Sequence, residues 1–324
     1  MTNFPDDTVS LVADIGGTNT RVALSQKGAL RAETVRRYRN ADNPSLEAVL
    51  KRFLGEMGDP DCKGASVAVA GPVRDGVGRL TNLDWSIDEE TLAKATKAET
   101  LWVLNDLEAQ GYALGSIAPQ NIKTVVQGKA GRPGAAELVV GIGTGFNAAP
   151  VLQSPFGRTV AASESGHITL PIRSNEDYDL ARFIENMTGF ASVEDVLSGR
   201  GVARVYAWAA GRSEMDGTED IATIMQACAD QSDPVAEKTV ATVVRMIGTV
   251  TGNLALVCLP FAGTFFIGGV ARAMAPYFDR FGFADAFCDK GRFGPFMSDF
   301  SIYVIEDDYA ALQGLAAHLE QRHS

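Results

Sequence analysis

The stretch LVADIGGTNTRVAL, residues 11–24, constrains the fold more than any other part of the chain. Two apolar runs flank Gly16-Gly17, a pattern that predicts two strands joined by a tight turn. Glycine permits backbone conformations closed to other residues and leaves room for a ligand against the main chain. Such a turn presents amide N–H groups to an anion, and Thr18 and Asn19 add side-chain donors. The alternative interpretation is an ordinary hairpin with a Gly-Gly turn.

Asp14 and Ile15 lead directly into this turn. A carboxylate suits a phosphate site only if a cation lies between the two negative charges. Mg²⁺ fits this position, because it keeps several waters and binds through one or two carboxylates plus phosphate oxygens. Asp14 is therefore the candidate magnesium ligand.

The length and charge of the chain restrict its organisation and partners. A chain of 324 residues exceeds the usual size of a single core, so we expect two lobes. Forty acidic against 29 basic residues give a net charge of −11, which disfavours nucleic acid or an anionic membrane as partner. Any bound phosphates must then be held mainly by backbone amides and a metal ion.

The sequence favours a cytoplasmic protein. Its four cysteines are far apart, without the spacing of a zinc site, and indicate a reducing compartment: Cys62, Cys228, Cys258 and Cys288. Residues 1–10 have neither a basic nor an apolar segment of the kind found in secretion signals. The most apolar long run, residues 239–259, contains Arg245 and Asn253, so we interpret it as a buried core helix rather than a membrane span.

Alternating strands and helices in the first third predict an α/β lobe. We expect strands at 29–38, 65–70 and 101–104, and helices that begin at Ser45, after Asp88 and at Asp106. The second half is more helical, with helices at about 176–187, 193–198, 200–210, 219–229, 234–257, 271–281 and 309–322, and strands at 264–267 and 301–305.

A second glycine turn suggests an internal duplication. Residues 138–153, LVVGIGTGFNAAPVLQ, match residues 11–26 at an offset of 127, although chance is an alternative for so short a match. Gly141 takes the place of Asp14, so only the first copy would hold the metal. A third turn, Gly268-Gly269, joins a strand to a helix; it could take an adenine ring or ribose, but close helix–strand packing is the favoured interpretation.

Polar side chains at three places could carry chemistry. Asn105-Asp106 follows a strand at the start of a helix, where Asp106 either caps the helix or acts as a general base. Glu164 and His167 lie three residues apart and either bind the hydroxyls of a neutral sugar or form a satisfied buried pair. Glu194 lies on an expected short helix that Gly199 would end.

Nine short motifs, in order and in register, resemble the proteobacterial type of bacterial glucokinase within the actin/hexokinase/heat-shock ATPase superfamily. They are DIGGTNTR (14–21), AGPV (70–73), LTNLDW (80–85), LND (104–106), GTG (143–145), ESGH (164–167), VLSGRG (196–201), IGGV (267–270) and DKGRF (289–293).

The resemblance implies an α/β, two-lobed, actin-like (ribonuclease H-like) ATPase fold with a cleft between the lobes. The expected smaller α/β lobe comprises residues 1–114 plus about 304–324, and the larger α+β lobe comprises 115–303. The implied reaction moves the γ-phosphoryl group of ATP, with Mg²⁺, to the 6-hydroxyl of D-glucose, in a protein that is commonly a homodimer.

The resemblance also implies roles for individual residues. Asp106 is the implied catalytic base, and the implied sugar ligands are Asn105, Glu164, His167 and Glu194. The implied nucleotide-binding residues are Asp14, Ile15, Gly16, Gly17, Thr18, Asn19, Gly143, Thr144, Gly145, Gly268 and Gly269, with Asp14 meeting Mg²⁺ through water.

Three positions depart from the resembling family. Its second phosphate loop usually ends in Gly-Leu-Gly, where this chain has Gly145-Phe146-Asn147. In its Glu-Gly-Gly-His motif, Ser165 takes the place of the first glycine in this chain. Pro150 follows in a strand where it suits only an edge. Ser165 leaves open a kinase for another hexose, and Asn147 leaves open a sugar-sensing regulator without catalysis.

Overall fold

The computed structural model describes residues 8–80, 84–212 and 220–323. The chain divides into two units: residues 1–119, 153–162 and 307–324 form the first, and residues 120–152 and 163–306 form the second. Each unit is built around one mixed β-sheet. Of the four points where the chain passes from one unit to the other, one falls within a strand of the second sheet, Phe146–Ser154, so the end of this strand and the next strand, Gly157–Val160, are assigned to the first unit.

The predicted hairpin forms the centre of the first sheet. Its strands pair antiparallel with Asp14 opposite Arg21, and the sheet order is β3-β2-β1-β5-β8, with β4 also paired to β2. The strands are β1 (Val9–Ile15), β2 (Asn19–Gln26), β3 (Ala29–Leu30), β4 (Arg36–Arg39), β5 (Cys62–Val69) and β8 (Thr100–Asn105). A separate small hairpin pairs β6 (Val73–Arg74) with β7 (Val77–Gly78).

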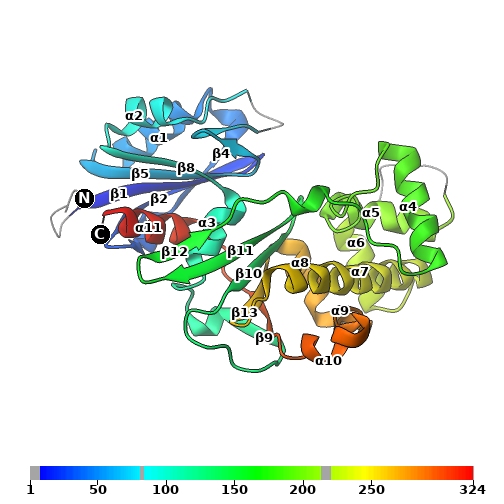
Figure 1. Cartoon of the computed structure of the whole chain (residues 1–324). Helices are drawn as coiled ribbons and strands as arrows, with labels where there is room; N and C mark the ends of the chain where they lie inside the picture. Colours follow the sequence, from blue (N-terminus) through cyan, green and yellow to red (C-terminus); the bar gives the residue numbers. More distant parts are fainter. Residues whose placement is uncertain (1–7, 81–83, 213–219, 324) are drawn as a thin grey trace. The chain divides into compact units, whose positions relative to one another are not determined.

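Helices cover both faces of this sheet, α1 and α2 one face and α3 and α11 the other (Figure 1). They are α1 (Leu46–Glu56), α2 (Glu89–Thr96), α3 (Asp106–Ala113) and α11 (Ala310–His323). As predicted, Ser45 and Asp88 cap α1 and α2, accepting hydrogen bonds from the backbone N–H groups of Ala48 and Thr91. The buried residues of α1 then pack on the sheet because they recur at helical spacing.

Helix α11 approaches α3 very closely. A Cβ atom added at Gly314 would lie 1.7 Å from the carbonyl oxygen of Ala109, so no other residue fits there without moving a helix. The C-terminal helix therefore sets the direction of α3, the helix that begins with Asp106.

The second sheet has the order β12-β11-β10-β13-β14-β9. Its strands are β9 (Ile122–Val126), β10 (Glu137–Ile142), β11 (Phe146–Ser154), β12 (Gly157–Val160), β13 (Gly263–Ile267) and β14 (Ile302–Ile305). Like the first, it contains an antiparallel hairpin, β10-β11, whose first strand also pairs with a parallel strand, β13. The suggested duplication is thus matched in topology, with a turn one residue shorter, since Ile142 pairs with Phe146 whereas Ile15 pairs with Thr20.

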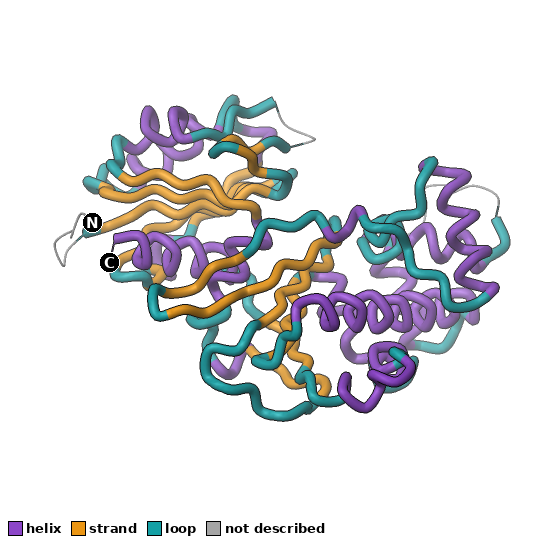
Figure 2. Tube along the Cα trace, viewed as in Figure 1, coloured by secondary structure: helices purple, strands orange, loops and turns teal. Residues whose placement is uncertain are grey.

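Beyond this sheet the second unit is mainly helical (Figure 2). Its α-helices are α4 (Asn175–Thr188), α5 (Gly199–Ala209), α6 (Ile221–Ala229), α7 (Pro234–Cys258), α8 (Gly269–Met274), α9 (Phe283–Cys288) and α10 (Gly294–Met297). Among the described residues, α7 alone has the length and apolar composition of a membrane span. It packs in the core of the unit, as predicted, and 67% of its most apolar window is buried.

Four local predictions were wrong. The expected strand at 29–38 is split into β3 and β4 by a 3₁₀ turn, Ala32–Thr34, in which the Thr34 hydroxyl accepts from the backbone N–H of Leu24. The expected helix at 271–281 ends as α8 at Met274, because Pro276 follows and cannot donate a helical hydrogen bond.

The other two corrections concern Glu194 and Pro150. Residues 193–198 form turns rather than a helix, because Ser192 and Asp195 bond each other's side chains and backbone, and Gly199 begins α5 rather than ending a helix. Strand β11, which contains Pro150, lies between β12 and β10 and is not an edge. Proline cannot donate a ladder hydrogen bond, and β12, with four residues against the nine of β11, leaves part of β11 without a partner on that side.

Candidate active site

Three predicted motifs of the first unit meet at one edge of its sheet. The parallel strands β1, β5 and β8 end side by side, because Ile15 pairs with Val69 and Val69 pairs with Asn105. The first glycine turn, the AGPV motif and Asp106 follow these three strand ends directly. In open α/β sheets, ligands bind at the carboxyl ends of parallel strands, so this edge is the candidate site of the first unit.

The first glycine turn is exposed at its tip and held at its base. Gly16 N–H donates to the carbonyl of Asn19 (3.0 Å), and the buried Asn40 donates from Nδ2 to the carbonyl of Gly16 (2.7 Å). Gly17 and Thr18 are exposed, and neither backbone N–H donates a hydrogen bond to any described residue. The backbone N–H groups of Gly17 and Thr18 are thus available to an anion. An ordinary hairpin turn that binds no ligand can also leave its N–H groups exposed.

Asp14 lies beside this turn with its side chain 21% exposed. Arg21 Nη1 is 3.4 Å from Asp14 Oδ2 and 3.4 Å from the backbone carbonyl of Asp308. Burial raises the pKa of Asp14, and the opposing attraction of Arg21 reduces that rise. A single carboxylate fits a magnesium ion that arrives on a nucleotide, because such an ion needs only one or two protein carboxylates. The described residues contain no cluster of three acidic, histidine or cysteine side chains that would hold a metal by themselves.

Asn105, not Asp106, is the N-cap of α3. Its Oδ1 accepts from the backbone N–H of Leu107 (2.9 Å), and its Nδ2 donates to the carbonyl of Gly71 (2.9 Å), tying β8 to the AGPV motif. Asp106 Oδ1 also accepts from Leu107 N–H (2.8 Å), and Asp106 is half-buried at the first position of the helix. Capping is therefore supplied by Asn105, so capping alone does not account for the carboxylate of Asp106.

In the second unit, two glycine turns meet at the ends of the parallel strands β10 and β13. Gly199 N–H donates to the carbonyl of Gly143 (2.8 Å), which fastens the turn 143–145 to the start of α5. Gly268 has φ 108°, and a Cβ atom there would lie 2.3 Å from the carbonyl oxygen of Ile142. Close packing therefore explains Gly268, as favoured from the sequence, whereas a Cβ at Gly269 would meet nothing within 4 Å.

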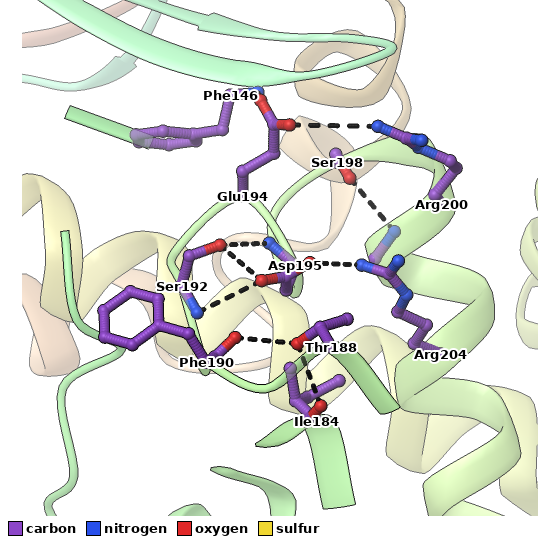
Figure 3. A network of polar contacts seen from close by, with 11 residues as sticks. Phe146, Ile184, Thr188, Phe190, Ser192, Glu194, Asp195, Ser198, Arg200 and Arg204 are labelled. Carbon is purple, nitrogen blue, oxygen red and sulfur yellow. Dashed lines mark hydrogen bonds and ion pairs between the residues drawn. The ribbon is translucent and has the colours of Figure 1, made fainter. Parts of the chain in front are cut away.

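Glu194 contacts the second glycine turn directly (Figure 3). Its Oε2 accepts from the backbone N–H of Phe146 (2.9 Å), and a Cβ atom at Gly145 would lie 2.5 Å from the same oxygen. Arg200 is a distant partner at 3.9 Å and is largely exposed. The carboxylate of Glu194 thus occupies the space that the missing side chain of Gly145 leaves.

The side chain of Asp195 fixes the segment 192–195, which carries Glu194 (Figure 3). Asp195 Oδ2 accepts from the backbone N–H of Ser192 (3.2 Å) and from its hydroxyl (2.5 Å), and Asp195 Oδ1 pairs with Arg204 of α5. Both charged side chains are less than one fifth exposed. A partly buried ion pair with these extra hydrogen bonds holds a non-helical turn in one conformation.

Glu164 and His167 lie close to Glu194. Glu194 N–H donates to the carbonyl of Gly166 (2.8 Å), between the two predicted sugar ligands. A Cβ atom at Gly166 would lie 2.1 Å from the carbonyl oxygen of Phe146, so a glycine is needed there. Burial raises the pKa of Glu164; the nearby His167 lowers it and the nearby Glu194 raises it further. Both Glu164 and His167 are exposed, which suits ligands of a diffusible sugar more than a satisfied buried pair.

Sequence reasoning did not identify Asn40, or the bonds that join Asn105 to Gly71 and Gly143 to Gly199. An asparagine twenty or more residues from the turn it supports leaves no local signal. Residues 81–83 of the LTNLDW motif lie outside the described residues.

These features define a class: two α/β units, each with a glycine turn and acidic side chains at the ends of parallel strands, as in actin-like sugar kinases. A glucokinase family model matches residues 11–322. The chain belongs to the glucokinase family.

Individual relatives agree with this assignment. A curated glucokinase of Marinobacter nauticus is 30% identical over 311 residues, which cover 96% of this chain and 97% of the relative. A crystal structure of glucokinase from an Antarctic psychrotroph has a TM-score of 0.83 at 29% identity and covers 98% of this chain and 99% of its own. A ROK family glucokinase from Streptomyces griseus, solved in complex with glucose and AMPPNP, shares the fold with a TM-score of 0.65 at 19% identity, covering 97% and 99% of the two chains.

Proposed function

We propose that this chain transfers the γ-phosphoryl group of ATP to the 6-hydroxyl of D-glucose, giving glucose 6-phosphate and ADP. Membership of the glucokinase family makes it an ATP-dependent sugar phosphotransferase. The observation that carries the assignment of roles is the position of Asp106, which follows β8 in the same row of strand ends as the first glycine turn.

In this proposal Asp106 takes the proton of the attacking sugar hydroxyl, the hydroxyl oxygen bonds to the γ-phosphorus, and the bond from the γ-phosphorus to the bridging oxygen breaks, so that this oxygen leaves on ADP. The exposed amides of Gly17 and Thr18, and those of Thr144 and Gly145 in the second turn, receive phosphate oxygens without reorganisation of the backbone, whereas Gly143 N–H donates to the carbonyl of Gly145. Asp14 is the carboxylate that would hold the Mg²⁺ of ATP, which supplies positive charge beside the phosphates when it is bound.

Four side chains are proposed to bind the hydroxyl groups of the sugar. Glu164, His167 and Glu194 of the second unit, with Asn105 of the first, are the proposed hydroxyl ligands. Gly268 and Gly269 are proposed to border the adenosine. The Streptomyces griseus protein, which has this fold, was solved with both a sugar and an ATP analogue, and this supports one protein chain serving both ligands.

The test is a coupled assay of ADP release from ATP, with and without glucose. Asp106→Asn should lower turnover by roughly a hundred- to ten-thousand-fold and leave glucose binding intact, because only the proton acceptor is removed. Asp88→Asn is the matched control, since Asp88 also begins a helix by accepting from an amide (2.7 Å) but lies at no proposed site. Glucose-independent ADP release, or near-normal turnover of Asp106→Asn, would contradict the proposal. A panel of other hexoses in the same assay tests strictness for glucose.

Three further features belong to this proposal. The two units are proposed to be the two lobes of the kinase, which would replace the expected boundaries near residues 114 and 304 by those near 119 and 307. The chain is proposed to act as a homodimer in the cytoplasm. Sedimentation velocity at assay concentrations would measure the dimer, and a monomer there would contradict it.

A further inference from the structure

The side-chain amide of Asn147 makes four hydrogen bonds. One goes to the next residue of its own strand, and three go to a segment that follows later in the chain. Oδ1 accepts from the backbone N–H groups of Ala148 (2.8 Å) and Ser165 (2.9 Å) and from the hydroxyl of Ser165 (3.1 Å). Nδ2 donates to the carbonyl of Ser163 (2.5 Å). Every polar atom of this half-buried side chain is engaged, and three of the four bonds reach the segment 163–165.

This amide joins two predicted parts of the active site within the second unit. Asn147 lies on β11 two residues after Gly145, opposite Gly141 of β10. Segment 163–165, to which the Asn147 side chain is bonded, carries Glu164. His167 is the last residue of the 3₁₀ turn that begins at Ser165. The side chain therefore links the strand that leaves the second glycine turn to the loop that presents two proposed sugar ligands.

Ser165 completes the connection from the other side. Its hydroxyl points to β11, donating to Asn147 Oδ1 and approaching the carbonyl of Ala148 (3.4 Å), and the residue is only 8% exposed. The hydroxymethyl group is thus committed to the strand and is not a ligand of the sugar. The two departures from the glycines of the resembling family, Asn147 and Ser165, are bonded to each other.

We propose that Asn147 is a positioning residue that fixes Glu164 and His167 for sugar binding, and that Asn147 and Ser165 act as one coupled pair. The proposal rests on the proposed function for its kinetic consequences. Its structural consequence is independent of the proposed function, because Asn147 accepts the hydrogen bond of the Ser165 amide within the protein itself. The loop 163–167 is therefore already ordered for the sugar before it arrives, which lowers the entropic cost of binding.

The experiment is a double-mutant cycle with Asn147→Gly, Ser165→Gly and the double variant. Asn147→Gly removes all four bonds and should raise the glucose KM about tenfold or more, with a smaller change in the ATP KM. Ser165→Gly removes only the hydroxyl and should raise the glucose KM about threefold. In the Asn147→Gly background, Ser165→Gly should not raise the glucose KM further, because the main partner of the Ser165 hydroxyl, Asn147 Oδ1, is already absent. Ser154→Gly is the matched control: its hydroxyl bonds the backbone of the β11-β12 turn, and the glucose KM should stay unchanged.

Amide hydrogen exchange over residues 163–167 supplies a readout that does not depend on activity. Asn147→Gly should abolish the protection of the Ser165 amide and leave that of α7 unchanged, whereas general destabilisation would lower both. Unchanged exchange at Ser165, additive effects in the cycle, or an equal rise of both KM values would each overturn the proposal. A wild-type protein without glucose-dependent ADP release would refute the proposed function alone, and the exchange experiment would still decide whether Asn147 positions the loop.

Discussion

Replacement of Gly145 by alanine tests the contact between the second glycine turn and Glu194. The added Cβ atom would lie 2.5 Å from Glu194 Oε2 and 3.3 Å from its carboxyl carbon. Ordinary contact begins near 3.4 Å, so the oxygen must withdraw by about 0.9 Å. A withdrawal of that size along the 2.9 Å hydrogen bond with the Phe146 amide would take the oxygen beyond bonding range.

The expected cost follows from the charge of the acceptor. A hydrogen bond to a charged group contributes about 1.5–3 kcal/mol, which corresponds to roughly ten- to hundredfold in an equilibrium constant. Because Glu194 is a proposed sugar ligand, Gly145→Ala should raise the glucose KM by that factor, measured in the coupled ADP-release assay. The variant Gly145→Ala/Glu194→Asp, whose shorter acid can avoid the new methyl group, should not be worse than Glu194→Asp alone.

Gly143 provides the comparison within the same turn. Its added Cβ atom would meet nothing within 4 Å, and neither glycine has a positive φ, so Gly143→Ala should leave the glucose KM unchanged. If that open space receives a phosphate, the ATP KM of Gly143→Ala should rise instead. Equal glucose KM values for the two alanine variants would refute the reasoning.

Two further predictions concern stability. Burial lowers the pKa of His318 to about 4 from the ordinary 6.5, so as pH falls through this range the unfolded chain binds a proton that the folded protein does not, and the free energy of unfolding should decrease by up to about 1.4 kcal/mol per pH unit. Chemical denaturation across that range should show this loss in the wild type and a shallower slope in His318→Phe; identical slopes would exclude the histidine as the cause. Gly314→Ala should destabilise the protein by about 1–3 kcal/mol through overpacking against Ala109, whereas Gly55→Ala, in α1 with no atom within 4 Å, should stabilise it by up to about 1 kcal/mol. Thermal unfolding would measure both, and equal shifts would contradict the close packing of α3 and α11.

The parts of the fold with local causes were predictable from the sequence. The hairpin around Gly16-Gly17, the caps at Ser45 and Asp88, and the core helix α7 depend on residues within a few positions of one another, and all are present. The turn around Glu194 was predicted as a short helix that Gly199 would end. The bonds between Ser192 and Asp195 compete with helix formation there, and the same Asp195 carboxylate also pairs with Arg204, nine residues further on.

The candidate site was predictable only in part, for a related reason. Glycines and acids at strand ends mark where ligands could bind, but the partners that fix them come from distant segments. Asn40 reaches Gly16 across 24 residues, and Asn147 reaches Ser165 across 18. Neither distance follows from periodicity, so Asn147 and Ser165 were predicted as separate departures when the structure joins them.

The close approach of α11 to α3 has a consequence for how the protein is made. The two helices are separated by about two hundred residues of chain, yet Gly314 lies against the carbonyl of Ala109. A ribosome therefore exposes the helix that starts with Asp106 long before its partner is synthesised. During translation the face of α3 that α11 covers in the folded protein therefore stays uncovered until α11 has been synthesised and has docked.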